Sequence, residues 1–334
     1  MHSDLLKRRE FMTLLGGAAA AWPLVARAQQ PGERRIGVLM ALAENDPEAR
    51  TRVSAFRQGL REIGWTEGHN ARIDFRWAAD DTNLMRTYAA ELVALAPDII
   101  VAHAPPPLAA VQQQTRSLPI VFVQVADPVG GGFVASLARP GGNTTGFTSF
   151  EDTISAKWLE LLREVLPQAT RVGIIRNPAT GTASQMLMGA IDALASSLGV
   201  QLTVVDVRGI AEIDRAFDML SRASIGGLIV MPDPITLVHR DRFIELAAEH
   251  KVPTVYPYRY FVAGGGLLSY GHNPADMWRR AAFYVDRILK GSKPADLPVQ
   301  NPTKFEVVVN LSTAKRLGIE LPLSLLMRID EVIE

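Results

Sequence analysis

The stretch Ile36-Gly37-Val38-Leu39-Met40 is a short apolar run, typical of a strand buried in a parallel sheet. In the segment after it, Val53, Phe56 and Leu60 recur at helical spacing, and Gly64 favours a helix end there. The same strand-then-helix unit repeats along the chain. Further strands are predicted at residues 72–77, 98–102, 119–125, 145–150, 172–176, 202–207, 227–231 and 253–256. Strands that alternate with helices predict βαβ units and therefore an α/β fold with parallel sheets.

A turn-rich segment divides this series into two. It contains Gly130-Gly131-Gly132 and Arg139-Pro140-Gly141-Gly142-Asn143. We therefore expect two doubly wound, Rossmann-like lobes. Residues after 271 are too few for a third lobe and are expected to cross back, which gives a three-segment hinge. The predicted organisation is lobe 1 at 34–147, completed by about 272–300, and lobe 2 at 148–271, completed by about 303–334.

Residues 1–28 have the order of a bacterial export signal. A basic start at Lys7-Arg8-Arg9 precedes an apolar run, and Ala26-Arg27-Ala28 places small residues where a signal peptidase cuts. The apolar run is shorter than the roughly 20 residues of a membrane span. Arg8-Arg9-Glu10-Phe11 also resembles a twin-arginine signal, with Sec export as the alternative. The pattern predicts a periplasmic protein cleaved near Ala28, and an amphipathic first helix is the competing interpretation.

Composition and motifs narrow the classes of function. The 35 Lys and Arg residues balance 35 Asp and Glu residues, and no basic block stands out, so a nucleic-acid partner is not predicted. The absence of cysteine excludes disulfides, thiolate metal sites and a cysteine nucleophile. The six histidines lack metal-ligand spacing, and the sequence contains no Gly-x-Ser-x-Gly, Walker-type or His-Glu-x-x-His motif. We predict no catalytic residue, metal or cofactor, and expect a monomer.

A ligand of such a fold is expected beyond the carboxyl ends of the strands. The candidate ligand-binding residues in the loops at those ends are Asn45, His103, Asp127, Asn177, Asp233, Tyr256 and Arg259. Several of these loops lead into helices, whose N-terminal N–H groups favour an anionic ligand group such as a carboxylate. The mixture suits a small zwitterion or carboxylate with an apolar portion.

Each candidate also has a purely structural interpretation. Asp127-Pro128, Asn177-Pro178 and Asp233-Pro234 are common turn and helix-cap dipeptides. The tyrosines at 256, 258 and 260 alternate along the chain, so they cannot all face one pocket.

Segments spread over nearly the whole chain resemble one known family. They include Arg35-Ile36-Gly37-Val38-Leu39, Phe56-Arg57-Gln58-Gly59-Leu60, Arg139-Pro140-Gly141-Gly142-Asn143 and Asp286-Arg287-Ile288-Leu289-Lys290-Gly291. The chain is similar to ABC transporter substrate-binding proteins of the tryptophan and tyrosine type. That resemblance implies a type I periplasmic-binding fold that closes on a small-molecule ligand, with an ABC permease and its ATPase subunit as partners and contact with the membrane only through the permease.

One departure from the family concerns the turn after the third strand. Members often have small hydroxylated residues there, whereas this chain has His103-Ala104-Pro105-Pro106. The ligand class is therefore left as an amino acid or an aromatic or branched carboxylate. Two other functions stay open, namely a periplasmic ligand sensor and an enzyme on the same scaffold.

Overall fold

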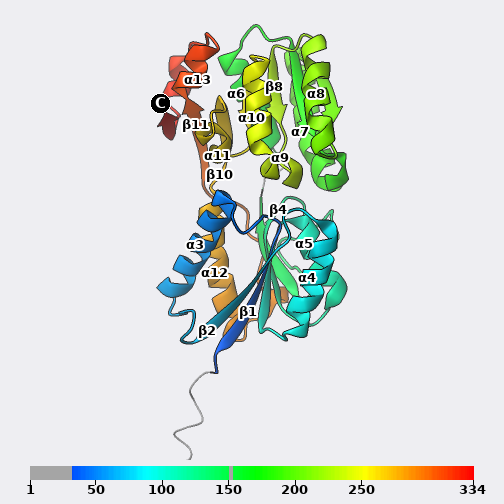
Figure 1. The fold of residues 1–334 in the computed structure, drawn as a ribbon, viewed down its shortest axis with the longest axis vertical. Coiled ribbons are helices and arrows are strands. Elements are labelled where there is room, and N and C mark those ends of the chain that lie inside the picture. The colour runs from blue at the N-terminus through cyan, green and yellow to red at the C-terminus, as the bar shows by residue number, and fades with distance from the viewer. Residues whose placement is uncertain (1–31, 150–152) are drawn as a thin grey trace, which may run out of the picture.

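The computed structural model describes residues 32–149 and 153–334. It contains two α/β units stacked along the long axis of the molecule (Figure 1). We call the unit built on the first sheet lobe 1 and the unit built on the second sheet lobe 2. The predicted fold class, two Rossmann-like lobes, is confirmed.

Lobe 1 contains a five-stranded parallel sheet in the order β2-β1-β3-β4-β5. The strands are β1 (Arg34–Met40), β2 (Ala71–Trp77), β3 (Ile99–His103), β4 (Ile120–Val125) and β5 (Thr144–Thr148). The three central strands are buried along nearly their whole length, which explains why they appear in the sequence as continuous apolar runs.

Two hydrophobic cores cover the two faces of this sheet. Helices α3 (Pro47–Glu62) and α12 (Pro274–Leu289) pack on one face, and α4 (Thr82–Ala94) and α5 (Pro105–Gln114) pack on the other. Helix α12 lies against α3 so closely that a Cβ at Gly59 would come 2.5 Å from the Arg279 carbonyl oxygen. Only glycine fits at that crossing.

Lobe 2 contains a seven-stranded sheet in the order β12-β11-β10-β9-β8-β6-β7. The strands are β6 (Arg171–Arg176), β7 (Gln201–Asp206), β8 (Gly227–Val230), β9 (Thr254–Tyr256), β10 (Leu268–His272), β11 (Phe305–Asn310) and β12 (Glu331–Ile333). Neighbouring strands are parallel except β10 and β11, which pair antiparallel. The sheet is therefore mixed, because the chain re-enters it from lobe 1, and the edge strand β12 was not predicted.

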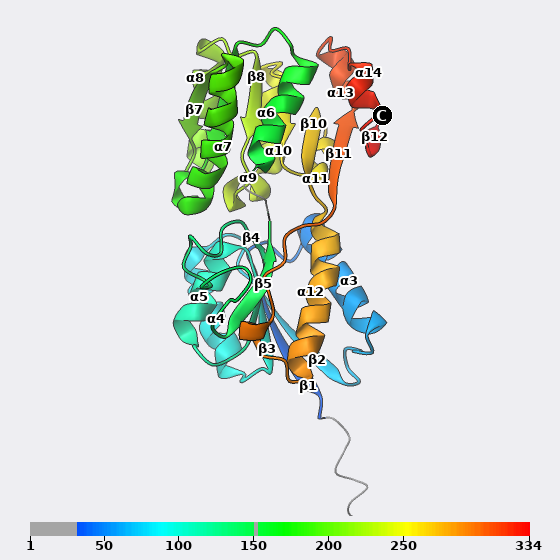
Figure 2. The ribbon, with the colours of Figure 1, turned by 180° about the vertical axis from the view of Figure 1, so that it is seen from behind.

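Helices cover both faces of the second sheet. Helix α6 (Ile154–Val165) packs beside α7 (Thr182–Leu198), and α8 (Ile210–Arg222) packs beside α10 (Arg240–Glu249). The α10 helix lies in front of the sheet in Figure 1 and α6 lies in front in Figure 2. The segment before β9 forms two helices, α9 (Pro234–Val238) and α10, with His239 between them.

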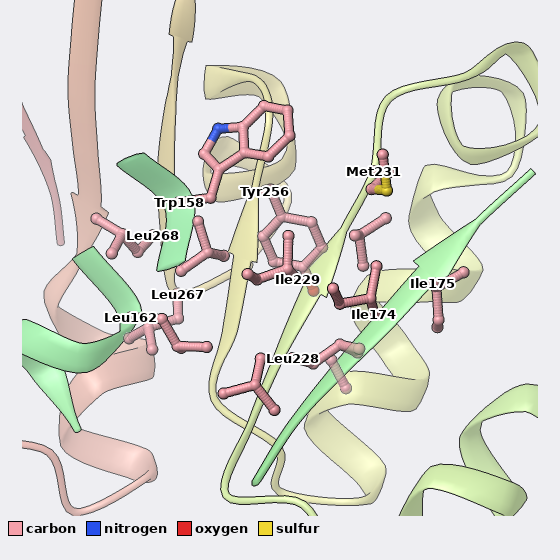
Figure 3. Packing of buried hydrophobic residues seen from close by; sticks show 14 of the residues in the cluster. Trp158, Leu162, Ile174, Ile175, Leu228, Ile229, Met231, Tyr256, Leu267 and Leu268 are labelled. Atoms are coloured by element: carbon pink, nitrogen blue, oxygen red, sulfur yellow. The ribbon is translucent and has the colours of Figure 1, made fainter. Parts of the chain in front are cut away.

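A single core holds lobe 2 together (Figure 3). Trp158 of α6 is fully buried and donates from Nε1 to the Tyr270 carbonyl oxygen of β10 at 2.7 Å. Side chains of β6 and β8, among them Ile174 and Ile229, fill the space beside Tyr256.

The chain passes between the lobes three times. It passes from β5 to α6, from β10 to α12, and from α12 back to β11. Before that return, residues 297–300 run along β5, where the Thr148 N–H donates to the Gln300 carbonyl oxygen at 2.9 Å. The remaining short elements are η1 (Pro178–Thr180), α11 (Arg259–Ala263), η2 (Pro294–Asp296), α13 (Leu311–Arg316) and α14 (Leu323–Leu326).

Charged groups meet where the lobes touch. Arg240 of lobe 2 donates from Nη1 to Oδ2 of Asp46 in lobe 1 at 2.9 Å, and both side chains are largely buried. Arg52 of α3 is fully buried, yet none of its three guanidinium nitrogens has a hydrogen-bond partner among the described residues. Its nearest carboxylate oxygen, on Glu48, is 3.9 Å away, and its Cζ lies 5.9 Å from the centre of the Tyr260 ring.

The segment after residue 271 is expected to be required for folding, because it supplies α12 to lobe 1 and β11 to lobe 2. A chain that ends at Gly271 should lose the cooperative thermal transition seen by circular dichroism. A chain that ends at Glu320 loses only α14 and the edge strand β12, and should melt cooperatively at a lower temperature. A cooperative melt of the shorter chain would contradict this organisation.

Arg52→Met is expected to stabilise the protein. A buried cation without hydrogen-bond partners costs desolvation energy, and an apolar side chain of similar length removes that cost. We expect the free energy of unfolding in urea to rise by about 1–3 kcal/mol. The control is Arg57→Met on the same helix, whose exposed ion pair with Glu67 should contribute less than about 1 kcal/mol. A loss of stability in Arg52→Met would show that the guanidinium is satisfied in solution.

Candidate functional site

A pocket lies between the lobes, where strand ends of both sheets meet. It contains about 790 Å³ of empty space, with its open mouth and the solvent there included. Most of its walls are apolar. Lobe 1 supplies Ala41, Leu42, Ala104, Pro105 and Ala126, and lobe 2 supplies Leu187, Met231, Pro232, Leu237 and Val238.

The polar groups on the lobe 1 side include His103 at the end of β3, Gln124 near the end of β4 and Ser149 just after β5. Gln124 has a left-handed backbone (φ 64°) at an irregularity in the pairing of β4 with β5. Its amide then lies 3.4 Å from Nε2 of His272 and accepts from Nε1 of Trp278 at 3.4 Å. Gln124 thus connects the end of β4 to the second crossing, at His272, and to helix α12, at Trp278.

Both histidines at this end of lobe 1 are held neutral. Burial and the nearby Arg52 charge lower the pKa of His103 well below its usual value, and the same two causes lower the pKa of His272 to about 3. His103 has no hydrogen-bond partner at Nδ1 among the described residues. Its neutral ring therefore offers the pocket edge one hydrogen-bonding nitrogen and no charge.

Asp233 is the principal polar group on the lobe 2 side. It caps α9: Oδ1 accepts from the Ile235 N–H at 2.7 Å and from the Thr236 N–H at 3.2 Å. The Thr236 hydroxyl accepts in return from the Asp233 N–H, which completes a capping box. The other carboxyl oxygen, Oδ2, is buried and has no hydrogen-bond partner among the described residues.

Burial raises the pKa of Asp233 to about 7, although the backbone donors at α9 and the Asn177 amide act in the opposite direction. Asp80, which follows β2 in lobe 1, adds a like charge from across the cleft, and burial raises its own pKa to about 6. Asn177 is buried and caps η1, where Oδ1 accepts from the Ala179 N–H at 2.9 Å. This end of the pocket is therefore suited to a cationic or hydrogen-bond-donating ligand group.

Ser184 lies in the first turn of α7 and lines the same pocket. Its side chain is buried, with 5% exposure, and its hydroxyl oxygen has no hydrogen-bond partner among the described residues. The helix begins at Gly181 without a side-chain cap.

The structure brings three of the seven candidate residues to the pocket and leaves four outside it. His103, Asn177 and Asp233 line it. Asn45 is exposed and lines a separate depression on lobe 1, and Asp127 is used in a turn, where Oδ1 accepts from the Gly130 N–H at 2.7 Å.

Of the remaining two candidates, Tyr256 lies in the core of lobe 2 and Arg259 lies on its surface. Tyr256 is 1% exposed and stacks on Phe261 with ring centres 4.8 Å apart (Figure 3). Its position in β9 turns the ring into the core and away from the strand end. Arg259 donates from Nε to Glu331 of the edge strand at 2.6 Å on the outer surface.

Sequence reasoning missed several pocket residues. Gln124 and Ser184 lie there, and so does Tyr258, which alternates with the core residue Tyr256. The alternation of tyrosines was the available signal for Tyr258. The left-handed backbone of Gln124 and the buried hydroxyl of Ser184 depend on contacts between distant segments and leave no local pattern.

The part of the chain that the structure describes contains no group of three or more acidic, histidine or cysteine side chains placed to hold a metal ion. Within the same residues, no helix is both long and apolar enough to span a bilayer. What the pocket offers is an apolar enclosure with a few polar atoms, an arrangement suited to reversible capture of a small molecule.

Known proteins resemble this chain over most of its length. It is 26% identical over 265 residues to a tyrosine-binding protein of Clostridioides difficile (strain R20291), which covers 79% of this chain and 76% of that protein. A solved structure of an ABC domain in complex with L-Trp from Streptococcus pneumonia is 25% identical, with a TM-score of 0.83, and covers 90% of this chain and 100% of that one.

A third relative is the ligand-free, open structure of a substrate binding protein with adhesive properties from Clostridium difficile. It is 27% identical, with a TM-score of 0.69, and the match covers 90% of this chain and 99% of that one. The model of the family described as "ABC transporter substrate binding protein" matches residues 35–333, nearly the whole described chain. The chain therefore belongs to the family of ABC transporter substrate-binding proteins.

Proposed function

We propose that the protein is the exported receptor of an ABC importer, which captures a small organic ligand between its lobes and presents it to a permease driven by its ATPase subunit. The observation that carries the proposal is the largely apolar pocket at the junction of both sheets, which is lined by Asp233 with its buried, unpartnered Oδ2. Such a site holds a ligand by shape and a few polar contacts, and needs no chemistry to release it.

The ligand class that fits is an amino acid, or an aromatic or branched carboxylate. The apolar walls at Leu42, Leu187 and Met231 suit a hydrocarbon or aromatic portion, and Asp233 suits an ammonium group. The names of two relatives support this class, because one is called tyrosine-binding and the other was solved with L-Trp.

The arrangement of the lobes supports closure on the ligand. The structure is more similar to the L-Trp complex, at a TM-score of 0.83, than to the open ligand-free relative, at 0.69, although the sequence identities are nearly equal. The Asp46–Arg240 ion pair joins the lobes in this arrangement. A hinge through three crossings allows the lobes to part and close as rigid bodies.

The proposal includes export to the periplasm as a monomer. The segment that directs it, residues 1–28 with cleavage near Ala28, lies outside the described residues and rests on its sequence pattern alone.

A thermal-shift screen tests the receptor function. Amino acids and small aromatic or branched carboxylates are added to the purified protein, because a ligand that binds only the folded state raises the melting temperature by mass action. A shift with one chemical class, with the compound recovered unchanged, supports a receptor. Consumption of the compound would identify an enzyme, and no shift across the panel would contradict the proposed ligand class.

Asp233 is expected to make the binding of an ammonium-bearing ligand depend on pH. The cation requires the carboxylate, which is protonated below its pKa of about 7, so affinity should fall as pH drops from 8 to 6, approaching tenfold per unit below the pKa. Asp233→Asn keeps a helix cap but removes the charge, and should flatten this dependence and weaken binding in calorimetry. Asp127→Asn, which changes a carboxyl outside the pocket, is the control, and equal pH profiles for all three proteins would remove Asp233 from the site.

Export is expected to depend on the twin-arginine pair. Replacing Arg8 and Arg9 together with lysine should leave the precursor inside a Gram-negative host, whereas the unaltered protein should be recovered from the periplasm with Gln29 as its first residue. Export of the double-lysine variant at an unchanged rate would favour the Sec route instead.

A further inference from the structure

The pocket is bordered by the first residues of three helices, and a helix start attracts anions only when its N–H groups are available. Helix α5 begins with Pro105, Pro106 and Pro107, which have no N–H to donate. The N–H of Ala104, just before them, donates to the Val123 carbonyl oxygen. Lobe 1 therefore offers no helix-start donors for an anionic ligand group at this turn.

The N–H groups at the start of helix α9 are already hydrogen-bonded by a side chain of the protein. Asp233 accepts from the Ile235 and Thr236 N–H groups, and Pro234 holds the first helical position. A carboxylate of the protein thus already satisfies these donors, and its charge opposes a second anion.

Helix α7 is the third of these helices, and it differs from both. It is 17 residues long, begins with Thr182, Ala183 and Ser184, and has no side-chain cap at Gly181. Three backbone N–H groups in its first turn have no partner within the helix, because the hydrogen-bonded ladder starts with the Gln185 N–H donating to the Gly181 carbonyl oxygen.

A second observation points to a ligand at the same place. The Ser184 hydroxyl is a buried polar group that lines the pocket and has no hydrogen-bond partner among the described residues. A buried hydroxyl without a hydrogen bond lowers the stability of the protein, and a ligand atom that bonds to it removes that cost. Arg176 lines the same side of the pocket and adds positive charge, although its Nε already donates to Asp206 at 2.9 Å.

We propose that the first turn of α7, with the Ser184 hydroxyl, is an anion subsite that binds the carboxylate of the ligand. The inference deepens the proposed function and rests on it. It assigns to lobe 2 both charged ends of a zwitterion, with the ammonium at Asp233, and leaves to lobe 1 the enclosure of the apolar portion. It also explains the effect of the proline run at 105–107, which removes the N–H donors at the start of α5 and so leaves the carboxylate to α7.

The test uses Ala183→Asp, Ser184→Ala and a control, Ser196→Ala, at an exposed position near the other end of α7. The first probe is acetate, titrated against chloride at constant ionic strength while the melting temperature is measured. The second is a pair of calorimetric titrations with L-tyrosine and with tyramine, which lacks the carboxylate.

We expect acetate to stabilise the unaltered protein and the Ser196→Ala control saturably. The response should weaken about tenfold in Ser184→Ala, which loses one hydrogen bond to a charged group. It should vanish in Ala183→Asp, whose own carboxylate takes the helix N–H groups and should raise the melting temperature without acetate. Tyrosine affinity should fall in both variants, with tyramine affinity unchanged in Ser184→Ala.

Two results would overturn the subsite: no saturable acetate response in the unaltered protein, or an equal response in Ala183→Asp. A tyrosine affinity that is the same in all four proteins would overturn it too. The proposed function fails separately. If acetate acts as expected but no amino acid or carboxylate of the panel binds, the ligand class is wrong and the anion subsite stands.

Discussion

Polar groups at the junction of the two lobes must all find partners, and that requirement organises the rest of the structure. Parallel sheets bring strand ends and helix starts to this junction, and each exposes backbone groups that cannot be buried alone. Most are satisfied by the chain's own side chains: Asp46 caps α3, Asn177 caps η1, Asp233 caps α9 and Asn273 caps α12. Among the buried atoms of the described chain that lack a hydrogen-bond partner, Oδ2 of Asp233, the Ser184 hydroxyl and Nδ1 of His103 belong to residues that line the pocket. The pocket thus lies where the protein's own side chains do not satisfy every buried polar group, and these groups can bind a small polar ligand.

Arg52 shows what this junction costs in stability. A fully buried guanidinium without a hydrogen-bond partner in the described chain is unfavourable by itself. Burial lowers the pKa of both His103 and His272, and the Arg52 charge lowers it further, so both rings stay uncharged. Burial and this one positive charge together keep the two histidines neutral, while Asp80 acts on Asp233 as a like charge. Sites of this kind commonly sacrifice stability for function.

The sequence was sufficient for the fold wherever one local signal decided the outcome. Apolar runs such as Ile36–Met40 indicated buried parallel strands. The Gly/Pro-rich residues 130–143 did not mark the end of the first series, because β5 follows them and pairs with β4 in the first sheet. The sequence was insufficient where partners are distant in the chain: the antiparallel pairing of β10 with β11 depends on a crossing from lobe 1. Asp127 and Asp233 are both followed by proline, yet one closes a turn and the other reaches the pocket. Similarly, Tyr256 and Tyr258 differ by two residues, and the end of β9 between them turns the first into the core and the second to the pocket.

The unequal division of polar groups between the lobes bears on how such a receptor would close. A ligand shifts the lobe equilibrium only through contacts that differ between the open and closed arrangements. Contacts made by lobe 2 alone, at Asp233 and the start of α7, would be the same in both and would hold the ligand without closing the lobes. Closure must then come from lobe 1, where Leu42, Ala104 and Pro105 remove the apolar portion of the ligand from water. The charged ends would therefore set which molecules are retained, and the apolar portion would set how firmly the lobes close around them.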